Sequence, residues 1–183
     1  RELQQAQLHL ERLRLRFTPF RVRRERQQLA AINALERVLE SRLPEGLSAA
    51  GERLVLFSHF HPKGWLQRCI RRELADLRER GWQVLLLTDR LDADALGWCG
   101  QQGIGWLRRR NEGRDFGAFQ DGWLWLQQQG LAAGLERLIL LNDSVYPVLN
   151  LGASSWPRFL DHAGDEVLGF SDSFQNGYHL QSY

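Results

Sequence analysis

The chain has 183 residues, 43% of them hydrophobic, and a formal net charge of +2. Such a length and composition allow one sizeable core, which predicts a single domain with an appended segment. The two cysteines, Cys69 and Cys99, lie far apart and lack metal-ligand spacing, which argues against a disulfide framework and a zinc site. No apolar run has the length of a transmembrane helix, and the first residues lack the apolar region of a signal peptide. We therefore expect a soluble, cytoplasmic protein.

The first 48 residues form a basic segment with helical spacing. Leu and Ile recur among Arg, Gln and Glu in "LQQAQLHLERLRLRF" and "RRERQQLAAINALERVLESRL", and Pro19 separates the two stretches. We predict a helical segment over residues 1–48, ahead of a domain over residues 49–183. Two interpretations of its charge remain open. The segment is either a linker or packing pair of helices, or a basic amphipathic surface. Such a surface would contact a polyanionic partner or anionic lipid headgroups at the inner face of the cell membrane.

From residue 49 onward, short apolar runs alternate with helical patterns. The runs are "RLVLFS", "WQVLLLT", "IGWL", "RLILL" and "EVLGF", and the helical patterns between them include "GWLQRCIRRELADLRERG", "DADALGWCGQQG", "DFGAFQDGWLWLQQQG" and "SSWPRFLDHAG". This alternation predicts an α/β fold with a Rossmann-like, mostly parallel sheet and helices on both faces. Continuous runs such as "VLLL" fit strands that are buried on both sides.

Polar residues follow nearly every apolar run. In open α/β sheets, ligands bind outside the carboxyl ends of the strands, so these residues are the candidate ligand contacts. They are Ser58, His59, Asp89, Asn111, Gly113, Arg114, Asp115, Gly117, Asn142, Asp143 and Ser144, together with Asp172, His179 and Gln181 after the last run.

The stretch "RNEGRDFGAFQDG" joins the third run to a helix. We expect a tight, left-handed turn at Gly113, a helix cap at Asp115, and a close approach of backbone or ligand at Gly117. The helix N-terminus, with Arg110 and Arg114 beside it, would attract an anion such as a diphosphate. The alternative is that Asp115 only caps the helix and the arginines are solvated.

The stretches "LILLNDSVYP" and "GFSDSFQNGYHLQSY" carry further candidates. Asn142, Asp143 and Ser144 offer hard oxygen ligands of the kind that suit Mg²⁺ or Mn²⁺ bound to phosphates, although an Asx turn would explain the same residues. Asp172 is a candidate general base, and His179 a candidate ligand or phosphate contact.

In this order and spacing, "RNEGRDFGAFQDG", "LILLNDSVYP", and "GFSDS" followed by "YHLQSY" resemble the rhamnan synthesis protein F family of bacterial polysaccharide-assembly proteins. The segment "FSHFHPKGWL" fits the start of that domain, so the resemblance covers about residues 51–183. It implies a glycosyltransferase-like domain of GT-A type, which builds rhamnose-containing cell-wall, capsule or O-antigen polysaccharide. The implied partners are a dTDP-, UDP- or GDP-sugar donor and a polysaccharide or lipid-linked glycan acceptor.

The resemblance also implies roles for the candidate residues. Asn142, Asp143 and Ser144 would occupy the place of the Asp-x-Asp motif, in which Asp143 would hold a divalent cation, although this motif has one carboxylate where the usual pattern has two. The nucleotide-sugar pocket would be lined by Asn111, Gly113, Arg114, Asp115 and Gly117, with Ser58, His59 and Asp89 nearer the nucleoside. The implied catalytic residues are Asp143, Arg114 and Asp172, the last as base in an inverting reaction. Without a metal, Arg108, Arg109 and Arg110 would compensate the phosphate charge.

Two other classes stay open at this point. The single carboxylate in the metal motif favours a non-catalytic carbohydrate-binding or scaffold domain with a degenerate transferase fold. The basic first segment and the seven tryptophans suggest a nucleic-acid-associated protein. Most of these tryptophans fall within apolar patterns typical of a core, so we expect no nucleic-acid partner. The chain starts on Arg1 without a methionine and stops within a pattern at Tyr183, so we expect a fragment whose domain is truncated at its C-terminus.

Overall fold

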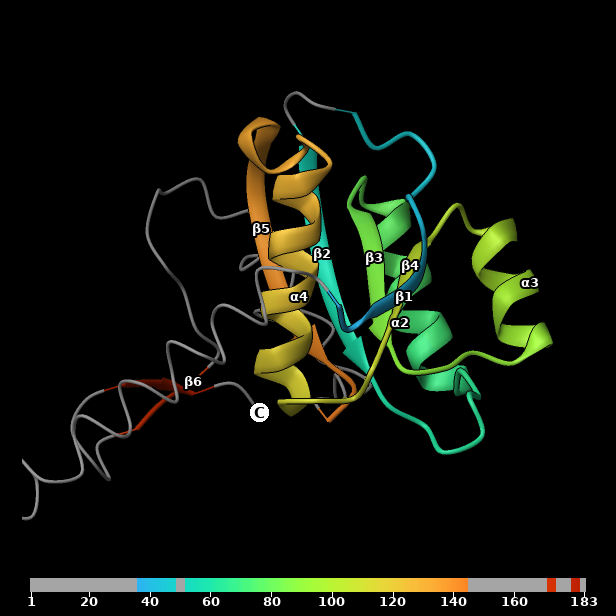
Figure 1. Cartoon of the computed structure of the whole chain (residues 1–183). Helices are drawn as coiled ribbons and strands as arrows, with labels where there is room; N and C mark the ends of the chain where they lie inside the picture. The colour runs from blue at the N-terminus through green and yellow to red at the C-terminus, as the bar shows by residue number, and fades with distance from the viewer. Residues whose placement is uncertain (1–35, 49–51, 145–170, 174–178, 182–183) are drawn as a thin grey trace, which may run out of the picture.

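The computed structural model describes residues 36–48, 52–144, 171–173 and 179–181 (Figure 1). A five-stranded sheet has the order β1-β4-β3-β2-β5, and β6 pairs with β7 in a separate two-stranded sheet. The strands of the larger sheet are β1 (Val38–Arg42), β2 (Glu52–His59), β3 (Gln83–Thr88), β4 (Gly105–Arg109) and β5 (Leu135–Asn142). The helices are α2 (Arg68–Glu79), α3 (Ala93–Gln101), α4 (Arg114–Gln128) and the 3₁₀ turn η1 (Ala132–Gly134). The small sheet pairs β6 (Ser171–Ser173) with β7 (His179–Gln181).

Helices cover both faces of the larger sheet. Apolar side chains of α2 and α3 pack with one face, and those of α4 pack with the other. Within β2, successive side chains enter the two faces in turn. Val55 and Phe57 pack on the face of α2 and α3, whereas Leu54 and Leu56 pack on the face of α4. All four are fully buried, which explains why this strand is a continuous apolar run. The predicted α/β fold is confirmed.

The strand order creates a switch point between β2 and β5. From β2 the chain passes through α2 to β3 and through α3 to β4, each a parallel neighbour on one side. After α4 it returns to the opposite side of β2 as β5, again parallel. The carboxyl ends of β2 and β5 therefore lie side by side, with Ser58 opposite Asn142 (Figure 1). In open α/β sheets a reversal of strand order is the usual ligand position.

The predicted helix is wrong for residues 38–42. These residues form β1, which pairs antiparallel with β4 and makes the sheet mixed. The spacing of "RVLESRL" suits a strand as well as a helix, and the open edge of β4 provides the hydrogen-bonding partner that decides between them. An ion pair of 3.2 Å between Arg108 and Glu40 adds to this pairing. The larger sheet therefore extends across the predicted boundary at residue 48.

Several predicted elements lie outside the described residues. They are the helical segment over residues 1–35, the helix in "SSWPRFLDHAG" and the strand "EVLGF". Among the helices that the structure describes, none combines the length and apolarity needed to cross a bilayer.

Helix α2 carries a buried carboxylate that links stability to pH. Burial, and to a smaller extent the Asp76 carboxylate, raise the pKa of Glu73 from 4.5 to about 7. Between these two values the folded state binds more protons than the unfolded chain, so stability falls as the pH rises. We expect Glu73→Gln to raise the free energy of unfolding by about 2 kcal/mol at pH 8 and to change it little at pH 4.5.

Urea denaturation of both proteins across this pH range checks the prediction. The control is Glu79→Gln on the exposed side of the same helix, which should leave the pH profile unchanged. An equal gain for Glu73→Gln at pH 4.5 and pH 8 would show that the carboxylate's ionisation is not the cause.

Candidate functional site

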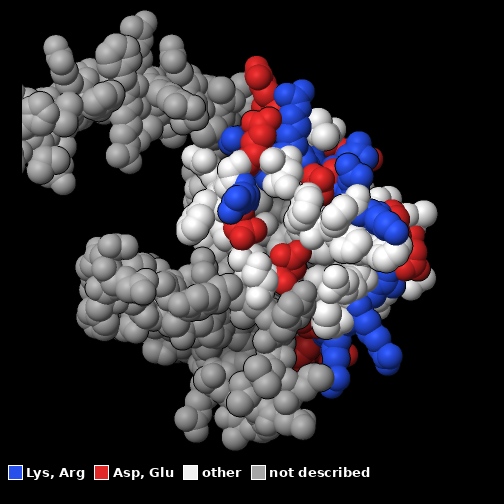
Figure 2. Space-filling view, turned by 90° about the horizontal axis from the view of Figure 1, so that it is seen from below, with Lys and Arg blue, Asp and Glu red and all other residues white. Residues whose placement is uncertain are grey.

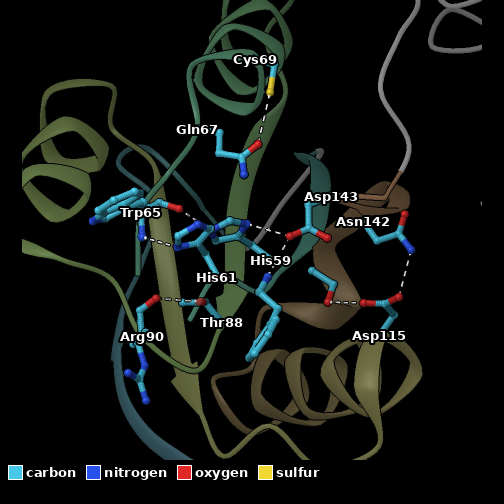
Figure 3. Close-up of polar contacts among 12 residues, drawn as sticks. His59, His61, Trp65, Gln67, Cys69, Thr88, Arg90, Asp115, Asn142 and Asp143 are labelled. Atoms are coloured by element: carbon cyan, nitrogen blue, oxygen red, sulfur yellow. Dashed lines mark hydrogen bonds and ion pairs between the residues drawn. The ribbon is translucent and has the colours of Figure 1, made fainter. Parts of the chain in front are cut away.

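Polar side chains from three elements meet where β2 and β5 end (Figure 3). Ser58 Oγ donates a hydrogen bond of 2.8 Å to Asp115 Oδ1, and Asn142 Nδ2 donates one of 2.9 Å to Asp115 Oδ2. Ser58 and Asn142 are buried. The carboxylate from the first turn of α4 is thus held by one donor from each of the two strands at the switch point.

This use of Asp115 differs from the predicted helix cap. The N-cap of α4 is Gly113, with φ at 75° and no side-chain cap, which confirms the predicted left-handed turn. Asp115 lies inside the first turn, and its carboxylate accepts from Ser58 and Asn142 instead of capping the helix. The sequence suggested a cap because the donors on the two strands, distant along the chain, were not visible in the local pattern. Between Gly113 and Asp115, Arg114 has φ at 51°, a conformation that costs a non-glycine residue about 1–2 kcal/mol.

A second pair, His59 and Asp143, lies next to this group. The ring of His59 is 3% exposed and bridges two acceptors, Asp143 Oδ2 at 2.9 Å from Nδ1 and the Trp65 carbonyl at 3.0 Å from Nε2. The backbone N–H of Phe60 also donates to Asp143 Oδ2, at 2.9 Å. Both ring nitrogens of His59 are therefore engaged within the chain, and His59 can act on a ligand only through Asp143 or the loop that carries Trp65.

The loop between β2 and α2 is held by contacts that the sequence pattern did not indicate. His61 Nδ1 accepts from the backbone N–H groups of Lys63 and Trp65, and the rings of His61 and Trp65 stack with centroids 5.2 Å apart. Gly64, with φ at 73°, allows the turn and leaves no room for a Cβ against the backbone at Leu91 and Asp92. The sequence "HPKGW" carries the turn residues that could have indicated this loop.

Two buried acceptor atoms at the carboxyl ends have no hydrogen-bond partner within the described structure. They are Asn142 Oδ1 and Asp89 Oδ1. The contact of Asn142 Nδ2 with a carboxylate fixes the amide orientation, because the reversed amide would place oxygen against oxygen. Buried acceptors are rarely left without donors, so an ordered water or a hydroxyl or N–H group of a ligand is the expected partner.

The three consecutive arginines have different surroundings. Arg109 is 3% exposed and forms an ion pair of 2.6 Å with Asp121, which is 1% exposed. Arg108 pairs with Glu40 of β1, whereas Arg110 is exposed. Of these three, Arg109 is thus committed to the interior of the fold rather than to a phosphate. No local pattern around Arg109 indicates this, because its partner Asp121 lies on the buried face of α4.

The remaining predicted site residues make no side-chain hydrogen bond with Asp115, Asn142 or Asp143 within the described structure. A Cβ at Gly117 would overlap the carbonyl oxygen of Glu112, so the predicted close approach is confirmed, with backbone as the neighbour. Asn111, Arg114 and Ser144 are exposed near the same ends of the strands. Asp172, His179 and Gln181 lie on β6 and β7, where Asp172 is opposite Leu180. The side chains of these two strands are not described, so their roles stay predictions.

A divalent cation at Asp143 would need carboxylate oxygens that are not already used in hydrogen bonds. Both oxygens of Asp115 and one oxygen of Asp143 already accept hydrogen bonds. Asp143 Oδ1 remains, and the described residues contain no group of three or more His, Cys, Asp or Glu side chains suited to hold a metal.

Charge on this face is mixed. Viewed from the carboxyl ends of the strands, basic and acidic side chains are interspersed over the described surface (Figure 2). An anionic ligand would therefore be attracted by individual arginines, such as Arg110 and Arg114, rather than by a broad basic field.

Comparisons of the chain with models of protein families, with curated proteins and with solved structures find no match.

Proposed function

We propose that this chain is a glycosyltransferase domain of GT-A type that takes a rhamnose-type sugar from a nucleotide-sugar donor during assembly of bacterial cell-surface polysaccharide. One observation supports it most. Asp115, Asn142 and Asp143, from two of the three sequence motifs, converge at the switch point between β2 and β5. That position is where open α/β sheets bind nucleotides.

The surroundings suggest how the donor would lie. Asn142 Oδ1 accepts a hydroxyl of the ligand, because it is buried and lacks a donor within the described structure. Arg110, just after β4, and Arg114, the first residue of α4, are exposed and take the diphosphate together with the N–H groups of the helix. In this proposal, Asn142 Oδ1 contacts hydroxyl groups of the donor, and Arg110 and Arg114 contact its phosphates.

The reaction would break the bond between the anomeric carbon and the β-phosphate oxygen while an acceptor hydroxyl oxygen bonds to that carbon. The departing diphosphate gains negative charge, which Arg114 and the N-terminus of α4 stabilise. The proton of the acceptor hydroxyl passes to a carboxylate, for which Asp172 is the candidate if configuration is inverted. The glycan acceptor and a membrane contact through the basic first segment are parts of the same proposal, and that segment lies outside the described residues up to residue 35.

A second candidate is a non-catalytic carbohydrate-binding domain. It is favoured by the internal use of the carboxylates, because Asp115 accepts through both oxygens and Asp143 already accepts two hydrogen bonds through Oδ2. A domain of this kind would bind the hydroxyl groups of glycans through Asn142 Oδ1 without a nucleotide.

Calorimetric titration with dTDP, UDP and GDP, with and without Mn²⁺, tests the proposal. We expect one nucleotide to bind, and Asp143→Ala to weaken its affinity by about tenfold or more. The control is Asp94→Asn, a carboxylate whose side chain is 77% exposed in the first turn of α3. Failure of all three nucleotides to bind a folded protein would contradict the proposal, and binding of a free oligosaccharide by the same sample would support the second candidate.

A further inference from the structure

The start of α4 has an unusual backbone that something else in the fold must hold. Gly113 and Arg114 are consecutive residues with positive φ, at 75° and 51°. A left-handed arginine persists only where its surroundings impose the conformation. This backbone matters for the site, because Asp115 follows directly and reaches Ser58 and Asn142 from it.

Arg109 is the residue that contacts this turn from inside the protein. Its guanidinium donates through Nη2 to the carbonyl of Glu112, the residue before the two left-handed positions. Through Nε it donates to Asp121 Oδ2 at 2.6 Å, about two turns into α4. Gly117 leaves the space in which the Glu112 carbonyl lies.

A second arginine holds the other end of the same turn. Arg37, just before β1, donates from Nη2 to Asp121 Oδ1 at 2.6 Å. Its backbone carbonyl accepts from the N–H of Arg110 at 2.8 Å. Residues 110–112 are therefore fixed at both ends by a network whose centre is the buried carboxylate of Asp121.

We propose that Arg109 is a positioning residue of the candidate site. Bound to Asp121, it fixes the Glu112 carbonyl, imposes the left-handed backbone at Arg114 and so directs Asp115 towards Ser58 and Asn142. Arg109 and Asp121 are almost completely buried, so they act through this backbone and not on a ligand. The identity of the ligand rests on the proposed function, whereas the geometry does not.

Arg109→Lys is the direct test. Lysine keeps the charge but has a single nitrogen, which cannot reproduce the guanidinium's separate bonds to the Asp121 carboxylate and the Glu112 carbonyl. In two-dimensional ¹H–¹⁵N spectra we expect displaced signals for the Asn142 side-chain amide and for the backbone amides of residues 112–116. If a nucleotide binds the wild-type protein, its affinity should fall about tenfold in the variant.

The matched control is Arg78→Lys. Arg78 also donates to two backbone carbonyls, those of Trp82 and Gln102, but it lies at the opposite ends of the strands. This variant should lose stability without moving the Asn142 amide signals. Equal displacement of those signals in both variants would overturn the proposal, because it would show a general loosening of the fold.

Gly117→Ala is the second variant, in case Arg109→Lys does not fold. The added methyl group would overlap the Glu112 carbonyl oxygen and lie 3.3 Å from Arg109 Nη2, so it disturbs the bond between these two groups while Arg109 and Asp121 keep their charges. We expect the same displaced signals, and unchanged signals would overturn the proposal. Because the spectra need no ligand, this test remains decisive if the chain binds no nucleotide and the proposed function fails.

Discussion

Replacing Asp121 with asparagine is expected to lower the free energy of unfolding by about 3–5 kcal/mol. The carboxylate is 1% exposed and is the common partner of Arg109 and Arg37, each at 2.6 Å. Asparagine removes the negative charge and leaves two guanidinium groups, one of them almost completely buried, without an anion between them. An uncompensated buried charge costs far more than a surface ion pair contributes.

Urea denaturation followed by tryptophan fluorescence measures this loss. Asp76→Asn is the control, because Asp76 pairs with Arg80 on α2 at 3.0 Å with both side chains about 40% exposed. We expect the control to change stability by less than about 1 kcal/mol. Similar losses for the two variants would mean that the ion pairs of Asp121 are no more important than a surface pair.

The replacement of His59 with leucine is expected to cost about 2–4 kcal/mol. The ring is buried and bridges the Asp143 carboxylate on one side and the Trp65 carbonyl on the other. Leucine fills most of the volume but removes both ring contacts, so the Asp143 carboxylate and the Trp65 carbonyl each lose a polar partner. We also expect the fluorescence of Trp65 to change, because its loop loses the connection to the end of β5.

His61→Leu provides the matched control for this prediction. His61 lies two residues further along, is more exposed, and accepts two long hydrogen bonds of 3.2 and 3.3 Å within its own loop. Its replacement should cost less than about 1 kcal/mol. A larger loss for His61→Leu than for His59→Leu in chemical denaturation would contradict the assignment of His59 as the bridging residue.

The sequence predicted the core of this fold well because its strands carry a strong pattern. β2 and β3 are continuous apolar runs, and the turn at Gly113 follows from the steric freedom of glycine. These features depend on the residues themselves and on near neighbours. The same applies to α3, which begins after Asp92, where the side chain accepts from the N–H of Ala95 in an ordinary cap.

The errors and omissions concern contacts between residues far apart in the sequence. β1 forms a strand because it pairs with the edge of β4, some 70 residues later in the chain. Asp115 does not cap α4, because its carboxylate accepts from Ser58, 57 residues earlier, and from Asn142, 27 residues later. No local pattern contains such partners. The sequence therefore identified the polar residues of the candidate site, but not which of them bind one another.

The order of the strands also affects when the site can appear during folding. Among the described residues, β5 is the last strand of the larger sheet along the chain, yet its neighbour is β2, the first of the parallel strands. A chain emerging from the ribosome can pair β2, β3 and β4 before β5 exists, but the bonds from His59 to Asp143 and from Asn142 to Asp115 must wait for residues 142 and 143. Contacts so distant in sequence also form slowly. Nascent chains released before residue 142 would therefore hold most of the sheet and none of the bonds to Asn142 and Asp143.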